Sequence, residues 1–235
     1  CLLVEDGDRL ILIDNGMGNK QDEKFFGFYY LHGEGELHQS LAKHGFNAAD
    51  ITDVVLTHLH FDHCGGSVKW KADRSGFELV FPNATYWMHH DQYHWAYPAP
   101  NAREKASFLK ENIQPIVESG HAKLIKDGEK AAGLDFLRVD GHTEAMILPK
   151  MHYKGQTILY CADLLPSIAH LPLPWIMAYD MRPLDTLREK TDILHMAASQ
   201  NWLLYFEHDP QIELCSLLIT DKGVKADQTL KLNDL

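Results

Sequence analysis

Four potential metal ligands follow one hydrophobic segment directly, and this feature limits most strongly what the chain can fold into. Val54-Val55-Leu56 is typical of a buried strand, and His58-Leu-His60-Phe-Asp62-His63 comes immediately after it. His58 and His60 are two residues apart, so on extended backbone they point the same way. Asp62 and His63 follow on the next turn and can face a second, neighbouring point. Imidazole and carboxylate ligands together suit zinc and also manganese, iron or cobalt.

Three later segments supply further candidate ligands, each at the end of a predicted strand or in a loop. They are His142 after Gly141, Asp163 after Leu159-Tyr-Cys-Ala, and His208 after Tyr205-Phe-Glu. The alternative is a histidine-rich loop that binds nothing, but the ligand types and their strand-end positions favour a metal site.

The remaining ten of the fifteen histidines are expected to lie in the core or on the surface. His89, His90 and His94 belong to an aromatic stretch, and such stretches usually serve packing. Cys64 and Cys161 lie near ligands, but buried cysteine most often behaves as a small apolar residue. We therefore leave these five residues out of the ligand set.

The pattern of apolar residues and turn signals predicts strands and helices in the same order twice, β-rich and then helical. Strands are expected at 2–5, 10–13, 51–56, 85–88, 122–125, 134–139, 145–152, 157–161, 202–206 and 213–219, and helices at 37–44, 101–120 and 183–199. Two sheets packed face to face with helices outside satisfy this order. With 235 residues, no repeat and no linker, we expect a single domain over 1–235. Because Cys1-Leu-Leu-Val reads like the middle of a strand, we expect a further N-terminal segment in the natural chain.

Charge and composition restrict the partners. A formal net charge of -11 repels nucleic acid and anionic lipid, and no run of 18 apolar residues exists. Four cysteines without a C-x-x-C pair favour a cytoplasmic protein over a disulfide scaffold. The expected partner is a small-molecule substrate, with no nucleic acid and no membrane, and a homodimer is left open.

The run from Ile51 to Gly66 resembles the H-x-H-x-D-H signature of the metallo-β-lactamase superfamily. Later segments resemble that family's further metal motifs in the family's order, and an early segment resembles its D-x-G turn. These segments are Gly141-His142-Thr143, Ala162-Asp163, Glu207-His208-Asp209 and, near the start, Asp14-Asn15-Gly16. The resemblance implies an α/β (α+β) fold, an αββα four-layer sandwich of two mixed β-sheets flanked by helices, with metals at one edge between the sheets.

The resemblance also implies a ligand set for two divalent metal ions, with zinc expected first and iron, manganese or cobalt as alternatives. Metal one would be held by His58, His60 and His142, metal two by Asp62, His63 and His208, and Asp163 would bridge them. Two such ions share a water, lower its pKa and present hydroxide to a carbonyl or phosphoryl group. Asp62 is expected to steer or accept the proton of that water as well.

The expected activity is metal-dependent hydrolysis, because the sequence has no Gly-x-Ser-x-Gly elbow, P-loop or dinucleotide fingerprint. The layout is most similar to the lactonase and methyl-parathion-hydrolase-like group, which implies an ester, lactone or phosphotriester-type substrate. One position departs from quorum-quenching lactonases, which typically have Tyr three residues after the bridging Asp where this chain has Pro166. The alternatives are a glyoxalase II-like thioesterase, a mononuclear-iron persulfide dioxygenase-like oxidoreductase and a silent metal-binding module.

Overall fold

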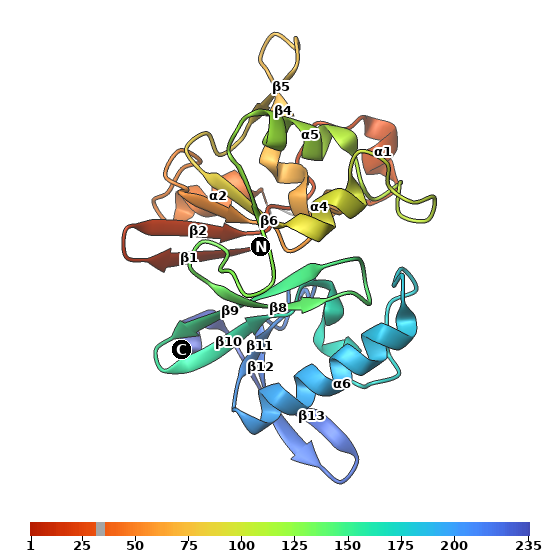
Figure 1. Ribbon diagram of the computed structural model, residues 1–235. Coiled ribbons are helices and arrows are strands. Elements are labelled where there is room, and N and C mark those ends of the chain that lie inside the picture. Colours follow the sequence, from red (N-terminus) through yellow and green to blue (C-terminus); the bar gives the residue numbers. More distant parts are fainter. Residues whose placement is uncertain (32–35) are drawn as a thin grey trace. The chain divides into compact units, whose positions relative to one another are not determined.

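The computed structural model describes residues 1–31 and 36–235, which divide into two compact units, Cys1–Lys126 and Asp127–Leu235. Each unit contains one mixed β-sheet with its own helices (Figure 1). Within these ranges, no helix has the length and apolar character that crossing a bilayer requires. The interpretation of the whole chain as one domain stays a prediction.

The first unit is built on a five-stranded sheet and a separate two-stranded ribbon. Its strands are β1 (Leu2–Asp6), β2 (Arg9–Ile13), β3 (Asp53–Val55), β4 (Val68–Trp70), β5 (Phe77–Leu79), β6 (Thr85–His89) and β7 (Ala122–Ile125). Its helices are α1 (Glu23–Gly27), α2 (Leu37–Lys43), α3 (Phe61–Cys64), η1 (Gly65–Ser67), α4 (His90–Ala96) and α5 (Lys110–Glu118). The sheet order is β1-β2-β3-β6-β7, and β4 pairs with β5.

Parallel pairing determines where the ligand segment of this unit lies. β2, β3, β6 and β7 run parallel to one another, while β1 forms an antiparallel hairpin with β2. The carboxyl ends of β2, β3 and β6 therefore meet at one sheet edge, where loops commonly carry function. Asp14 follows β2 at this edge, His58 and His60 follow β3, and His90 follows β6. All three residues of β3 are buried, so the ligand segment leaves a rigid strand.

The second unit is a six-stranded sheet with one long helix. Its strands are β8 (Asp135–Val139), β9 (Met146–Tyr153), β10 (Gln156–Tyr160), β11 (Leu203–Tyr205), β12 (Leu214–Thr220) and β13 (Gly223–Leu230). Its helices are η2 (Ala162–Leu164), η3 (Ile168–His170), α6 (Pro183–Ser199) and η4 (Leu232–Asp234). The order is β13-β12-β11-β10-β9-β8, and α6 packs on β12 and β13 (Figure 1).

In this sheet only β10 and β11 are parallel among the paired strands, since β10 and β11 are joined by the crossover that contains α6. β8 runs in the same direction as β10, because β9 is antiparallel to both. The carboxyl ends of β8, β10 and β11 thus share one edge. His142, Asp163 and His208 follow these three strands, so the topology brings them to the same edge.

Most of the elements expected from the sequence are confirmed, and one helix is wrong in extent. The hairpin of β1 and β2 turns at Gly7-Asp8, and the hairpin of β9 and β10 turns at Lys154-Gly155, where both residues have positive φ. The helix expected at 101–120 is limited to α5. Residues 102–107 form turns, in which the Asn101 side chain accepts the N–H groups of Arg103 and Glu104.

The loop after β2 packs directly against the backbone that follows the ligand segment. The Gly66 N–H donates to Gly16 O (2.8 Å), and the Asn15 N–H donates to His63 O (2.9 Å). A Cβ atom on Gly66 would lie 2.1 Å from Asn15 O, and one on Gly65 would lie 2.3 Å from Met17 O. These two glycines therefore permit a contact that positions α3 against the Asp14 loop.

We expect Gly66→Ala to lower the free energy of unfolding by about 2 to 4 kcal/mol, because the methyl group overlaps a backbone oxygen that cannot move freely. Gly76→Ala is the matched control, since a Cβ there meets nothing within 4 Å and its φ is not positive. Urea denaturation of both variants measures the difference. Equal stability of the two variants would show that the loop does not pack on Gly66 as described.

Candidate metal centre

The first unit holds its four candidate ligands on a short, mostly buried segment. His58 and His60 lie between β3 and α3, and His60 takes the N-cap position of α3 with extended backbone. Asp62 and His63 lie in the single turn of α3. The three imidazoles are buried, whereas the Asp62 side chain keeps 33% of its surface exposed, and Asp62 Oδ2 lies 3.7 Å from His63 Nε2.

Asp14 holds two parts of this segment through a buried carboxylate. Its Oδ1 accepts the Thr57 N–H (2.8 Å), and its Oδ2 accepts both the Thr57 hydroxyl (2.7 Å) and His63 Nδ1–H (3.0 Å). Because a carboxylate only accepts, the Thr57 Oγ1 lone pair is left to accept His58 Nδ1–H (3.1 Å). Asp14 thereby sets the tautomers of His58 and His63, as a carboxylate behind a metal-ligating histidine does.

This network directs imidazole lone pairs toward one another. With Nδ1 protonated, His58 presents an unprotonated Nε2, which lies 3.0 Å from His60 Nδ1. His60 Nε2 lies 3.4 Å from the Glu104 carboxylate. The facing nitrogens of His58 and His60 can share a proton, or both can bind one cation that lies between them. The donor set therefore fits a divalent metal ion.

In the second unit, both oxygens of Asp163 face imidazole nitrogens. Asp163 Oδ2 lies 3.2 Å from His142 Nε2, and Oδ1 lies 3.1 Å from His208 Nε2. Asp163 and His142 are buried, and the His208 side chain is 38% exposed. Each oxygen of the Asp163 carboxylate thus faces a different histidine. In this arrangement a carboxylate can bind two metal ions, one through each oxygen.

His142 is oriented by a residue far away in the sequence. Its Nδ1 lies 3.0 Å from Asp180 Oδ1, and both side chains are buried. A carboxylate on Nδ1 favours the Nδ1–H tautomer and leaves Nε2 for a metal.

The loop that carries His142 packs closely on the start of α6. Gly141 permits this contact, since a Cβ there would lie 2.4 Å from Thr186 N. Glu189 of α6 accepts the N–H groups of Asp140 and Gly141, at 2.7 and 3.0 Å.

A buried lysine holds the loop that leads to Asp180. Lys190 is fully buried on α6, and its Nζ donates to the carbonyl oxygens of His170 (2.7 Å), Pro172 (3.1 Å), Leu173 (3.3 Å) and Trp175 (2.8 Å). Burial lowers the pKa of Lys190 to about 8, and the four carbonyl dipoles favour its charged form. The loop after η3 is thereby tied to α6.

The two cysteines near the ligands are buried thiols. Cys64 Sγ donates to Leu59 O (3.3 Å), and burial raises the pKa of Cys64 to about 12. Burial also raises the pKa of Cys161 well above its ordinary value. Burial thus disfavours the thiolate of both side chains, and the thiolate is the form that binds metals.

The structure brings the seven sequence-predicted ligands together as two sets, one in each unit. The first unit groups His58, His60, Asp62 and His63, and the second groups His142, Asp163 and His208. The residues that orient these ligands were not predicted from the sequence, and they are Thr57, Glu104, Asp180 and Lys190. Thr57 precedes His58 directly and could have been found by its position, whereas Asp180 is 38 residues from His142 and gives no local signal.

Comparisons with known proteins extend over both units. Residues 1–208 match the family described as the metallo-beta-lactamase superfamily. A probable metallo-hydrolase of Mycobacterium tuberculosis is 24% identical, with 90% of this chain and 74% of that protein covered. An N-acyl homoserine lactonase of a Bacillus species is 27% identical over 154 residues, which are 61% of this chain and 54% of the lactonase.

Two solved structures are similar along nearly the whole chain, each with 26% identity. A probable metal-dependent hydrolase from Staphylococcus aureus gives a TM-score of 0.85, with 97% of this chain and 79% of that chain covered. AidC, a dizinc quorum-quenching lactonase in complex with a product, gives a TM-score of 0.77, with 98% and 79% covered.

We expect Asp180→Asn to weaken metal binding about 10- to 100-fold, because the amide still accepts a hydrogen bond but loses the charge that makes His142 a better ligand. Asp192→Asn, which makes the same substitution at an exposed position on α6, is the control. Competition of each variant with a chelator of known affinity measures the effect. Metal affinity equal to that of the control would show that Asp180 does not support His142 as a metal ligand.

Proposed function

We propose that this chain, a metal-dependent hydrolase that belongs to the metallo-β-lactamase superfamily, holds two divalent metal ions in one centre and hydrolyses an ester, lactone or phosphotriester-type substrate. The observation that carries this proposal is Asp163, whose two oxygens address His142 and His208 separately at 3.2 and 3.1 Å. A carboxylate in that position can act as a ligand shared by two metal ions.

The proposed centre joins the ligand sets of the two units. The first metal ion would be held by His58, His60 and His142, the second by Asp62, His63 and His208, and both by Asp163. Zinc is the proposed metal, because the set is rich in imidazole and each set also contains a carboxylate. The dizinc lactonase among the similar structures supports this choice.

When bound, two divalent ions supply Lewis acidity and an activated water. The chain's own residues supply rigidity and a proton acceptor. The Asp14 network fixes the rings of His58 and His63, and the Asp180 carboxylate fixes the ring of His142. The Asp62 carboxylate is partly exposed, so it can take the proton of the attacking water at its oxygen and pass it to solvent.

Two observations support the proposed substrate class: the similarity to lactonases and one difference from them. The lactonases support a cyclic or open ester, in which a carbonyl group is attacked. In this chain Pro166 accepts the His208 N–H (3.0 Å) and has no hydroxyl group to donate to a substrate oxygen. We therefore propose open esters and phosphotriesters alongside lactones. The four free thiols support a reducing compartment, and we propose the cytoplasm.

A substrate panel tests this proposal. We expect zinc-loaded protein to hydrolyse at least one of an aryl ester, an N-acyl lactone and an aryl phosphotriester, and to lose this activity on treatment with a chelator. A thioester and a glutathione persulfide belong in the same panel. If the protein contained one iron per chain and converted only the persulfide, the proposed hydrolase function would be wrong and the oxidoreductase alternative would be favoured.

We expect the wild-type protein to bind about two zinc ions per chain and Asp163→Asn to retain one or fewer, because the neutral amide no longer offsets the repulsion between two cations. Elemental analysis after equilibration in buffered zinc measures both proteins. His195→Ala, at an exposed position on α6, is the control and should keep two ions. A saturated wild-type protein that never exceeds one ion would contradict the binuclear centre.

We expect Asp62→Asn to remain about 100- to 10,000-fold slower than wild type even at full metal occupancy, since an amide cannot accept the proton of the attacking water. Turnover at saturating metal is measured with occupancy checked on the same sample. Recovery of wild-type turnover by excess metal would leave Asp62 with ligation as its only role.

A further inference from the structure

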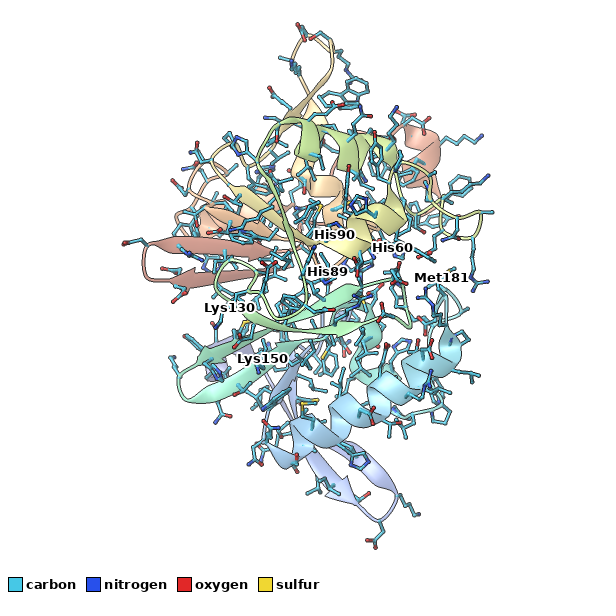
Figure 2. All side chains as sticks on the ribbon, viewed as in Figure 1. His60, His89, His90, Lys130, Lys150 and Met181 are labelled. Atoms are coloured by element: carbon cyan, nitrogen blue, oxygen red, sulfur yellow. The ribbon has the colours of Figure 1, made fainter. Side chains whose placement is uncertain are left out.

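We propose that His90 and His94 form a separate surface site that binds one divalent transition-metal ion, namely Cu²⁺, Ni²⁺ or Zn²⁺. Both histidines lie on α4, which follows β6 (Figure 1), and Figure 2 labels His90 at the start of this helix. Neither belongs to the ligand sets described above. This proposal does not depend on the hydrolytic function.

The spacing and the ring contact fit chelation. His90 and His94 are four residues apart on one helix, so they lie on the same face. Their ring centroids are 4.4 Å apart, with an angle of 63° between the ring planes. A metal ion about 2.0 to 2.1 Å from each nitrogen places two ring centroids roughly 4.5 to 5.3 Å apart for bond angles of about 90° to 109°. The observed separation is close to the lower limit of this range, which corresponds to a bond angle of about 90°.

A carboxylate already orients one of the two rings. His90 Nδ1 lies 3.0 Å from Asp91 Oδ1, which favours the proton on Nδ1 and leaves the Nε2 lone pair available. This carboxylate and imidazole pair has the form found behind metal-ligating histidines. The His90 side chain is 36% exposed and His94 is exposed, so an ion can reach both from solvent.

The third histidine of this stretch serves the helix instead. His89 is buried and occupies the N-cap of α4, where its Nδ1 accepts the Asp91 N–H (3.2 Å). The site therefore offers two imidazoles, and water completes the coordination. Imidazole favours Cu²⁺ and Ni²⁺ over Mn²⁺ and over hard cations, so these ions bind best. Because only two protein side chains bind it, this ion exchanges with solvent more readily than an ion that three or four side chains bind.

The test is Ni²⁺ binding by untagged, zinc-loaded holoenzyme, measured by equilibrium dialysis with nickel and zinc both quantified. We expect one Ni²⁺ per chain to bind without release of zinc. His94→Ala should weaken this binding about ten-fold or more, because the second imidazole acts at high effective concentration. Asp91→Asn should weaken it less, since the ring keeps its position but loses the charged partner.

His195→Ala is the matched control, because it removes one exposed histidine from another helix. It should leave Ni²⁺ binding unchanged. His90→Gln provides a second disruption if His94→Ala does not fold, as judged by circular dichroism. Three results would overturn the proposal: no Ni²⁺ bound, Ni²⁺ uptake that is matched fully by zinc release, or equal binding by His94→Ala and His195→Ala.

Discussion

The structure depends on an electrostatic constraint, which is that buried imidazole lone pairs and carboxylate oxygens face one another at the ends of strands. His58 Nε2 and His60 Nδ1 lie 3.0 Å apart, and both oxygens of Asp163 face imidazole nitrogens. Such groups repel or remain poorly solvated unless a cation or proton neutralises them. Divalent metal ions would satisfy this constraint in both ligand sets.

The rest of each unit maintains this arrangement. In the first unit, Asp14 connects β2 to the segment after β3, and the glycines at 65 and 66 allow the Asp14 loop to approach. In the second unit, Lys190 binds four carbonyl groups of the loop before Asp180, and Asp180 orients His142. The buried charge of Lys190 costs stability unless all of its hydrogen-bond partners are in place. The correct fold of this loop is therefore linked to the orientation of the proposed ligand His142.

The sequence predicted the fold class and the ligand candidates because both rest on local patterns. His58, His60, Asp62 and His63 follow a hydrophobic strand directly, and the two mixed sheets with their helices are confirmed by the comparisons. Contacts between distant residues, such as Asp180 with His142, leave no local pattern. β13 was missed because its polar side chains lack apolar alternation, and the helix expected from Asn101 was too long because its capping side chain closes turns instead.

We propose that the two ligand sets close on one binuclear centre that shares Asp163. Anomalous X-ray diffraction from crystals of the zinc-loaded protein locates the metal ions. We expect two zinc peaks about 3.5 to 4 Å apart, both in contact with Asp163, one bound by His58, His60 and His142 and the other by Asp62, His63 and His208. A single peak, or two peaks without a common contact to Asp163, would contradict it.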